Sequence, residues 1–438
     1  MTNYERTTCL VVGGGPAGMV LGLLMARAGV EVTVLERHGD FLRDFRGDTV
    51  HASTLTLLDE LGLGERFAAV PQRRLERIMG QLDEGTVQIS DLRRLPGAHQ
   101  HIALVPQWDF LDLLARDAEE EPTFTLRRHA DVTGLVRDGS RVIGVHYIDR
   151  ETGEEHELHA PLTVACDGRG SVVRSAAGLV PRGFGVPMDI WWFRLPRHDS
   201  DPAGGVGRFS TGHFCVMIDR GDYWQCGYLI RKGSDTEMRS AGIAAFRERI
   251  AGLLPWLAGR MNALASFDDV KLLDVRLERL RRWDLDGLLL IGDAAHAMSP
   301  VGGVGINLAV ADAVATARLL APALRSGGIV PRSMLRRVQR RRWWPTALIQ
   351  GAQRFAHKAI LRPTVGATPP PVPQVGMFDH DEPGLFTPAP RAGLPFPLRM
   401  LQRFPALQAI PAYLVAIGPL PEHAPPWARR APRRESTI

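Results

Sequence analysis

The sequence has few cysteines and no cluster of metal-ligating residues. Its 438 residues include 4 cysteines, and these are far apart and form no C-x-x-C pair: Cys9, Cys166, Cys215 and Cys226. Such spacing excludes a disulfide scaffold and disfavours a zinc site or a redox pair, so no metal is predicted. It is typical of a protein from a reducing cytoplasm.

Lysine is also scarce. Only 3 of the 53 cationic residues are lysines, so the formal net charge of +5 is carried by arginine. Acidic residues are interleaved with the arginines along most of the chain, which argues against a nucleic-acid-binding track. The one dense run, from Arg332 to Arg342 followed by Trp343 and Trp344, is interpreted as a solvated helix face. An anionic cofactor or partner and a membrane surface are the alternatives for this run.

Long uninterrupted apolar runs are missing as well. The first apolar stretch, at 9–12, is short and leads into glycines, so no signal peptide is predicted. A longer stretch of small residues, at 300–323, carries Asn307, Asp312 and Arg318, which argues against a transmembrane span. We therefore expect a cytoplasmic protein without stable membrane insertion. The sequence does not indicate its oligomeric state.

The N-terminal region has the pattern of a dinucleotide-binding unit. A strand-like run at 8–12 leads into Gly13-x-Gly15-x-x-Gly18, a helical pattern and a second strand at 30–35. The first glycine permits a tight turn, the second lets the backbone approach a pyrophosphate, and the third lets helix and strand pack closely. Glu36 ends the second strand, where its carboxylate accepts hydrogen bonds from a ribose diol and repels a 2′-phosphate. The unit therefore predicts bound NAD or FAD, and not NADP.

Two changes in residue composition and pattern divide the rest of the chain. Aromatic, alternating runs at 190–195, 212–218 and 223–230 predict an inserted antiparallel sheet, the last two joined as a hairpin. A buried strand at 288–291 and a Gly/Ala-rich helix follow. Beyond residue 361 the chain holds 17 of its 32 prolines, which predicts a segment that wraps the surface and contains one amphipathic piece near 399–417.

The expected fold class is α/β. A Rossmann-like nucleotide-binding domain is predicted in two parts, 1–182 and 276–325, around an inserted sheet domain at 183–275. Helices at 52–61 and 108–120 and strands at 132–136 and 142–148 belong to its first part. The remaining 326–438 is predicted as a helical, proline-rich C-terminal segment.

Two further motifs point to one family. The run from Val164 to Arg174 is a strand ending in Asp167-Gly168, and the run from Leu290 to His296 is a strand ending in Gly292-Asp293. With the glycine turn, and in this order, they resemble the class A flavoprotein monooxygenases, the 4-hydroxybenzoate hydroxylase-like family. The resemblance extends from the glycine turn to about residue 320.

The resemblance implies FAD as the cofactor and NADH or NADPH as a co-substrate. It further implies that a flavin hydroperoxide transfers oxygen from O2 to a hydrophobic, aromatic or polyketide-like small molecule, by hydroxylation or epoxidation. The protein would then hold the ring, exclude water and orient the substrate. An FAD-containing reductase or cyclase of the same fold that does not oxygenate is the alternative.

Residue roles follow from the same resemblance. Asp293 matches the aspartate on the ribityl chain of FAD, and Pro300 matches the proline beside the flavin ring, where it is grouped with the catalytic residues. The helix that opens near Gly303 would direct its positive N-terminal end at the N1 and O2 region of a reduced flavin. The implied cofactor-binding set is Gly13, Gly15, Ala17, Gly18, Glu36, Arg37, Arg46, Gln107, Asp167, Gly292, Asp293, Pro300, Gly303, Gly305, Ile306 and Asn307.

The hairpin of the inserted sheet is expected to form one wall of the substrate site. Period two alone does not decide whether His213, Cys215 and Met217 or Phe214, Val216 and Ile218 face inward, with Tyr223 and Gln225 opposite. His213 is a candidate catalytic base that deprotonates a phenol, and a structural histidine is the alternative. The aromatic residues of the sheet indicate either a large hydrophobic substrate or a packed core: Trp191, Trp192, Phe193, Phe209, Phe214 and Trp224.

Overall fold

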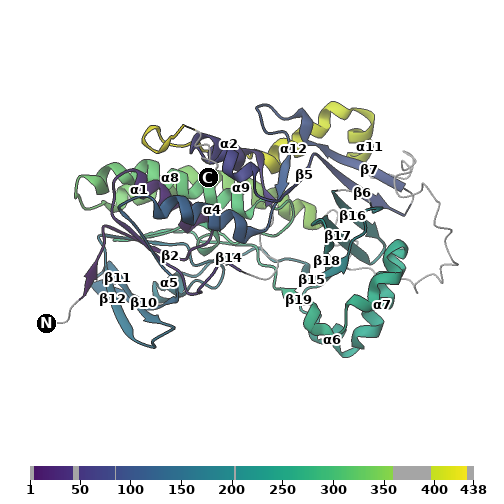
Figure 1. Cartoon of the computed structure of the whole chain (residues 1–438), viewed down its shortest axis with the longest axis horizontal. Helices are drawn as coiled ribbons and strands as arrows, with labels where there is room; N and C mark the ends of the chain where they lie inside the picture. The colour runs from purple at the N-terminus through teal and green to yellow at the C-terminus, as the bar shows by residue number, and fades with distance from the viewer. Residues whose placement is uncertain (1–3, 43–48, 84, 202–203, 359–395, 432–438) are drawn as a thin grey trace, which may run out of the picture.

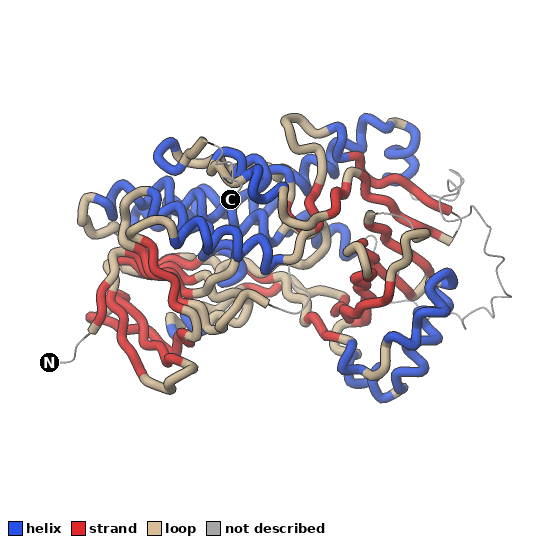
Figure 2. Tube along the Cα trace, in the orientation of Figure 1, coloured by secondary structure: helices blue, strands red, loops and turns tan. Residues whose placement is uncertain are grey.

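Two lobes, each built on its own β-sheet, make up the chain in this computed structural model (Figures 1 and 2). The structure describes residues 4–42, 49–83, 85–201, 204–358 and 396–431. Within these residues the strands form five sheets, two of which are large. A cavity lies between the two lobes.

The first lobe is a Rossmann-like α/β unit. Its six-stranded sheet has the order β21-β22-β13-β2-β3-β9 and is parallel apart from the β21–β22 pair. Four of its strands are buried along their whole length, as expected for continuous apolar runs covered on both faces. The strands are β2 (Cys9–Val12), β3 (Val32–Leu35), β9 (Phe124–Arg127), β13 (Leu162–Ala165), β21 (Asp284–Leu285) and β22 (Leu288–Leu290).

Helices and a second sheet cover the two faces of this parallel sheet. On one side lie α1 (Pro16–Arg27), α4 (Gln107–Glu119) and α8 (Gly305–Arg325), as Figure 1 shows. On the other side lies a four-stranded sheet with the order β1-β12-β11-β10. Its strands are β1 (Glu5–Arg6), β10 (Ala130–Asp138), β11 (Arg141–Asp149) and β12 (Glu155–His159), and the short helix α5 (Val172–Ala176) packs on β10.

The second lobe contains a seven-stranded sheet with the order β19-β15-β18-β17-β16-β6-β7. Five strands come from the inserted region: β15 (Met188–Pro196), β16 (Gly205–Ser210), β17 (His213–Asp219), β18 (Tyr223–Arg231) and β19 (Lys271–Leu273). The other two, β6 (Arg77–Leu82) and β7 (Gly85–Asp91), come from a much earlier part of the sequence. The predicted boundary at residue 183 missed this hairpin, because β6 joins the edge of the sheet only through its parallel pairing with β16. The sheet is therefore mixed rather than purely antiparallel.

One face of this sheet is covered by α6 (Asp235–Ser240), α7 (Gly242–Leu253) and the 3₁₀ segment η2 (Pro255–Ala263). Smaller elements connect the lobes or edge the sheets. They are α2 (Ala52–Glu60), α3 (Gly64–Ala68), β4 (Thr49–Val50), β5 (Arg73–Leu75), β8 (Ile102–Leu104), β14 (Arg182–Gly183), β20 (Glu278–Arg279), η1 (Leu92–Arg94), η3 (Phe267–Asp269) and η4 (Gly292–Ala294).

The C-terminal region returns to both lobes. The long helix α9 (Arg332–Ala356) packs on α8, and α12 (Ala409–Ala416) packs on β7 and η1. The amphipathic piece predicted near 399–417 consists of α11 (Phe396–Arg403), η8 (Pro405–Gln408) and α12, because Pro405 removes a backbone donor and starts a new turn. The last element in the described part of the chain is η9 (Pro426–Ala428). Residues 359–395, which hold many prolines of the predicted wrapping segment, lie outside the described residues.

Helix α8 is long and apolar enough, by length and composition alone, to cross a membrane. It also satisfies the requirements of a core helix. Most of its residues are buried, and it packs between α1 and α9. Its apolar character is thus accounted for by the hydrophobic core of the first lobe.

Candidate functional site

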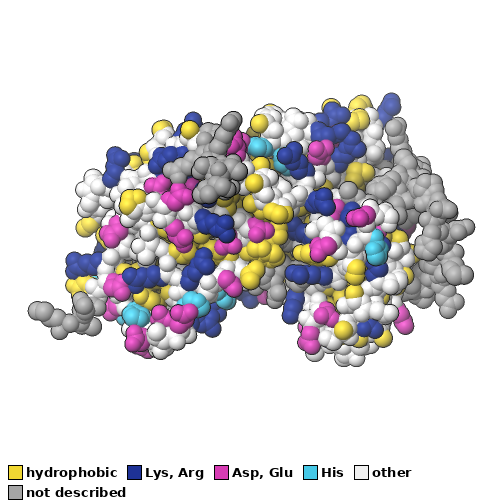
Figure 3. All heavy atoms as spheres, viewed as in Figure 1, with side chains coloured by type: hydrophobic (Ala, Val, Ile, Leu, Met, Phe, Trp, Pro, Cys, Tyr) yellow, Lys and Arg dark blue, Asp and Glu magenta, His cyan; other side chains and the backbone are white. Residues whose placement is uncertain are grey.

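A cavity of about 730 Å³ runs between the two lobes. It begins at the glycine turn after β2, passes Asp167 and Asp293, and follows the loop at 300–306. Its far wall is the open face of the seven-stranded sheet. Figure 3 shows hydrophobic side chains gathered between the two lobes on the face drawn.

The glycine turn forms one end of the cavity. Gly13 has a φ of +101°, and a Cβ there would lie 2.6 Å from the carbonyl oxygen of Cys166. A Cβ on Gly18 would lie 1.9 Å from the carbonyl oxygen of Gly13, so α1 begins in direct contact with the turn. A Cβ on Gly15 would meet nothing within 4 Å. The turn is therefore closed toward the protein and open toward the cavity.

Glu36 fixes the turn from the end of β3. Its Oε2 accepts a hydrogen bond from the N–H of Gly14 at 2.8 Å, and its Oε1 accepts one from the N–H of His38 at 3.0 Å. The carboxylate is buried and lines the cavity. The residue that the sequence assigns to a ribose diol thus also shapes the phosphate-binding turn.

The Asp-Gly and Gly-Asp segments meet beside the turn. Arg174 joins them, since its guanidinium donates to the carbonyl oxygens of Ala294, at 3.0 Å, and of Arg169. Arg169 in turn donates from Nε to Oδ2 of Asp293 at 3.0 Å. Arg169 was missed as a cavity residue, although it directly follows the Asp-Gly pair. Burial raises the pKa of Asp167, whose Oδ1 has no hydrogen-bond partner among the described residues.

The loop before α8 is held by backbone and side-chain contacts. The N–H of Gly303 donates to the carbonyl oxygen of Pro300 at 2.9 Å, and the hydroxyl of Thr49 donates to the carbonyl oxygen of Gly303 at 3.2 Å. Asn307 turns its Oδ1 toward α2, where it accepts from the N–H of His51 at 3.1 Å and the hydroxyl of Thr54 at 2.6 Å. The loop is therefore tied to the start of α2 while its backbone lines the cavity.

His51 supports the same loop from within the cavity wall. It is fully buried, its Nδ1 donates to the carbonyl oxygen of Val415 at 2.8 Å, and its Nε2 lies 3.2 Å from the hydroxyl of Thr49. Burial lowers the pKa of His51 to about 4, against the opposing effect of the Val415 hydrogen bond. The imidazole is thus neutral at physiological pH, with its tautomer set by the C-terminal segment.

The residues present fit an FAD molecule. Helices α1 and α8 both begin at the cavity without a side-chain cap, so their N–H groups and positive ends suit a pyrophosphate and an anionic flavin edge. The open side of Gly15 leaves room for a close approach to the backbone. The unpartnered Oδ1 of Asp167 offers a buried acceptor.

The structure brings most of the predicted cofactor residues to this cavity. Those that line it are Gly13, Gly15, Ala17, Glu36, Arg37, Gln107, Asp167, Asp293, Pro300, Gly303, Gly305 and Ile306. Gly18, Gly292 and Asn307 stand behind the lining as supports. Arg46 lies outside the described residues.

The sheet turns Phe214, Val216 and Ile218 toward the cavity, and His213 away from it. His213 is buried on the opposite face, where its Nδ1 lies 2.7 Å from the hydroxyl of Tyr228. The structure thus does not support His213 as a catalytic base and favours the structural alternative, because the pleat of β17 points its side chain away from the site. The aromatic residues divide in the same way. Trp192, Phe209 and Phe214 line the cavity, while Trp191, Phe193 and Trp224 pack in the core beneath α7.

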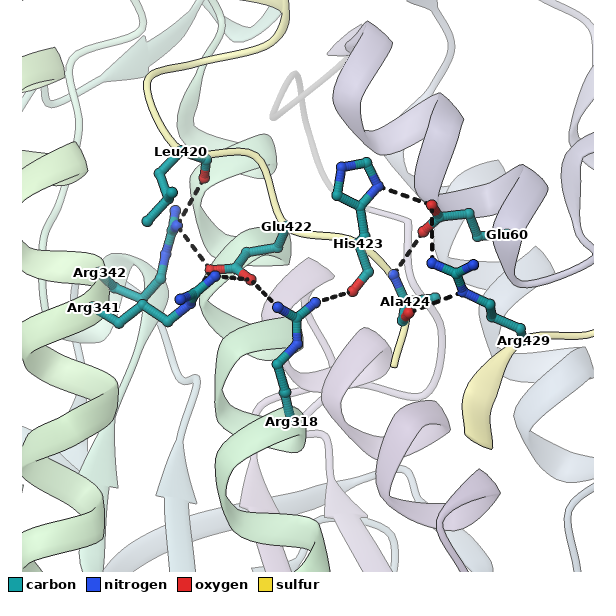
Figure 4. A network of polar contacts seen from close by, with 9 residues as sticks. All are labelled: Glu60, Arg318, Arg341, Arg342, Leu420, Glu422, His423, Ala424 and Arg429. Atoms are coloured by element: carbon teal, nitrogen blue, oxygen red, sulfur yellow. Dashed lines mark hydrogen bonds and ion pairs between the residues drawn. The ribbon is translucent and has the colours of Figure 1, made fainter. Parts of the chain in front are cut away.

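The arginine-rich run on α9 is only partly a solvated face. Figure 4 shows Glu422 of the C-terminal segment between Arg318, Arg341 and Arg342. Nε of Arg341 donates to Oε1 of Glu422 at 2.6 Å, and Arg318 and Arg342 form ion pairs with the same carboxylate. Arg342 is 1% exposed, and it also donates from Nε to Oδ1 of Asp312 at 3.0 Å. These arginines therefore bind internal carboxylates, which corrects the expectation of a solvated helix face for that part of the run.

The same buried carboxylate reaches the Gly-Asp segment. Asp312 accepts from the N–H of Gly292 at 3.1 Å and contacts Nε2 of His296 at 2.5 Å. Burial alone would raise the pKa of Asp312, but His296 and Arg342 hold it below its ordinary value. A chain of buried polar groups thus connects the C-terminal segment to the turn that carries Asp293.

Comparisons with known proteins agree with this geometry. Residues 6–349 match the family model described as an FAD binding domain. The chain is 36% identical over 342 residues to a 6-methylpretetramide 4-monooxygenase from Streptomyces rimosus, with 74% of this chain and 79% of that protein covered. It is 28% identical over 329 residues to a 12-dehydrotetracycline 5-monooxygenase/anhydrotetracycline 6-monooxygenase from Streptomyces rimosus subsp. rimosus, covering 70% of this chain but 61% of that longer protein.

A solved structure supports the fold. The anhydrotetracycline hydroxylase OxyS from Streptomyces rimosus superposes with a TM-score of 0.68 at 24% identity, over 94% of this chain and 76% of that one. At this level of identity the likeness concerns the arrangement of the two lobes.

Proposed function

Because this chain belongs to the FAD-binding class A flavoprotein monooxygenases, we propose that it hydroxylates a planar, hydrophobic, polyketide-like aromatic molecule with NAD(P)H and O2. The observation that carries the proposal is the continuous cavity from the glycine turn to the apolar sheet wall. One end suits the phosphates of FAD and the other suits an apolar substrate. The names of the relatives, which are polyketide monooxygenases, support the same substrate class.

When bound, FAD supplies the redox chemistry, taking a hydride from NAD(P)H and activating O2. We assign the phosphates to the N-terminal N–H groups of α1 and a ribose hydroxyl to Glu36. The N-terminus of α8 stabilises negative charge at the reduced ring. Pro300 and the apolar face of the sheet exclude water from the reacting atoms, and neutral His51 adds no competing positive charge. A cytoplasmic location is part of the proposal, and the four cysteines, all free thiols in the structure, support it.

The proposed cofactor contacts make a direct prediction about FAD retention. Glu36→Ala and Asp293→Ala should each weaken FAD binding by roughly 1 to 3 kcal/mol, because each removes charge-assisted hydrogen bonds. Fluorescence titration of the apoprotein with FAD measures the change. Glu31→Ala, which removes an exposed carboxylate beside the other end of β3, is the matched control and should leave the affinity unchanged. Equal affinities in all four proteins would contradict the assignment.

The reaction is tested by supplying a polycyclic phenolic substrate, NAD(P)H and isotopically labelled O2. We expect a product heavier by one labelled oxygen atom and faster NAD(P)H oxidation in the presence of substrate, since substrate completes the shielding of the site. Pro300→Trp, which adds bulk beside the ring, should release hydrogen peroxide in place of product. Product formed without O2 and without NAD(P)H would replace this proposal by a non-oxygenating cyclase.

A further inference from the structure

The wall of the cavity opposite the nucleotide-binding lobe is a flat face of the seven-stranded sheet. Cross-strand register places its side chains in rows, and the central row is Trp192, Gly227, Val216 and Gly207. A Cβ on Gly227 would lie 2.8 Å from Cζ3 of Trp192 and 2.9 Å from Cγ1 of Val216, so the indole lies directly across this glycine. A side chain at position 227 would lift the indole off the sheet. The wall is therefore a flat surface suited to a planar ring system.

The two rows beside it differ in chemistry. One consists of Ile190, Leu229, Phe214 and Phe209, with the two phenylalanine rings 4.3 Å apart. The other contains Gln225 and Ile218, which are cross-strand partners, and reaches the strand end near Arg220. The rows lie four residues apart along the strands, or roughly 13 Å. A ligand on this wall thus meets an apolar end and a polar end.

Gln225 presents a donor to the polar end. It is 2% exposed and lines the cavity, and its Oε1 accepts a hydrogen bond from Nε of Arg220 at 2.9 Å. Because a guanidinium only donates, the oxygen of the amide must face Arg220 and the nitrogen must face away. Among the described residues, no hydrogen bond from Nε2 of Gln225 is found. The charge of Arg220 also polarises the amide and strengthens this donor.

Trp192, which lines the cavity in the central row, carries a second donor. Its Nε1 is buried and has no acceptor in the described part of the chain. A buried N–H that binds nothing costs free energy, which a ligand acceptor would offset. The other side chains of the sheet that line this wall carry no hydrogen-bonding group. Among the described side chains of this wall, the one amide acceptor is therefore already engaged by Arg220, and the two donors remain.

We propose that Gln225 and Trp192 determine substrate specificity by donating hydrogen bonds to carbonyl or phenolate oxygens on one edge of a planar fused-ring substrate. This inference rests on the proposed function, because it takes the sheet wall to be the substrate site. The apolar row receives the oxygen-free edge of the rings. The two donors thus choose the orientation in which the substrate lies against the reacting end of the cavity.

Equilibrium binding of two flat probes to the FAD-loaded protein tests this. Alizarin has three fused rings with carbonyl and phenolic oxygens, and anthracene has the same rings without oxygen. Gln225→Leu keeps the size of the wall but removes one donor, so it should raise the Kd of alizarin about tenfold and leave that of anthracene unchanged or lower. Trp192→Phe removes the other donor together with part of the ring, so it should raise the Kd of alizarin more than that of anthracene. Quenching of protein and flavin fluorescence gives both constants.

Leu229→Ala is the matched control, since it removes apolar contact from the opposite row and should weaken both probes alike. Unchanged alizarin binding in the two donor variants, or an equal loss for both probes, would overturn the inference. FAD content and labelled-oxygen incorporation are recorded in parallel. If the wild type shows the donor-dependent binding but incorporates no oxygen, the proposed function fails and the inference stands. If oxygen is incorporated but neither donor is needed for alizarin binding, the inference fails and the proposed function stands.

Discussion

Replacement of Asp312 by Ala is expected to destabilise the protein by about 3 to 5 kcal/mol, because it removes one of the two carboxylates that face the buried Arg342 and leaves Nε2 of His296 and the N–H of Gly292 without their acceptor. Asp312 is fully buried on α8, where it contacts His296 and Arg342 and accepts from the N–H of Gly292. Arg342 is itself 1% exposed, so after the change its charge has no access to water and Glu422 is its remaining carboxylate. The loss also frees the turn that carries Asp293, and FAD retention should fall together with stability.

Urea unfolding of the apoprotein and of the FAD-loaded protein measures the effect, and the comparison separates folding from ligand linkage. Asp286→Ala is the control, since Asp286 pairs with Arg141 at 2.8 Å but is 41% exposed in its side chain, and it should change stability by less than about 1 kcal/mol. Asp312→Asn keeps the shape of the side chain if the Ala variant does not fold. Two variants at position 312 as stable as Asp286→Ala would contradict the account of this network.

The sign of the pH dependence follows from the lowered pKa of Asp312. A carboxylate with a lowered pKa in the folded state stabilises the protein above its unfolded pKa of about 3.9, and this stabilisation is lost as the pH falls through the folded value. The stability difference between wild type and Asp312→Asn should therefore be full at neutral pH and should shrink in acid.

Gly18→Ala is expected to abolish FAD retention at micromolar concentrations, with a loss of affinity of at least about hundredfold, or roughly 3 kcal/mol. A Cβ at position 18 would lie 1.9 Å from the carbonyl oxygen of Gly13, so the start of α1 must move away from the turn. That movement displaces the N–H groups assigned to the phosphates. The flavin content of the purified protein and titration of the apoprotein measure the change.

Substitutions at two other glycines serve as comparisons for Gly18→Ala. Gly15→Ala places a methyl group in open space, so the apoprotein should keep its stability while FAD affinity falls, because only the bound phosphates would meet the added atom. Gly351→Ala, on an exposed position of α9 with nothing within 4 Å, should be neutral or slightly stabilising. If Gly18→Ala retained FAD as well as Gly351→Ala does, the close approach of α1 to the turn would not be required.

Local motifs made the cofactor site predictable from the sequence. The glycine turn, Glu36 and Asp293 each stand at the end of a buried strand, and parallel strands bring their carboxyl ends to one edge of a sheet. The turn geometry follows from the positive φ of Gly13, which is a property of a few consecutive residues. Short-range sequence therefore carried enough information to place these groups together.

The cavity wall formed by the seven-stranded sheet was less predictable, because the alternation of side chains along β17 is compatible with either face pointing toward the cavity. Packing of α7 decides which face of the sheet is inward. Phe246 of α7 packs against Trp191 and Phe193, so the face that carries these two residues belongs to the hydrophobic core. His213 shares that face, and for this reason it lies away from the cavity. The addition of β6 and β7 likewise depends on an edge pairing between segments more than a hundred residues apart.

The sequence by itself determined that this chain forms a dinucleotide-binding turn of a flavoprotein with an inserted sheet, since strand, turn and helix signals act over a few residues. The tertiary structure alone decided which face of that sheet lines the cavity, that Gln225 and Trp192 lie on that face, and that Arg342 is buried between Asp312 and Glu422. The physical reason is that burial and pairing depend on which distant surfaces exclude water from one another. A local pattern records that a residue is apolar or charged, whereas its partner is selected only when the lobes and the C-terminal segment pack together.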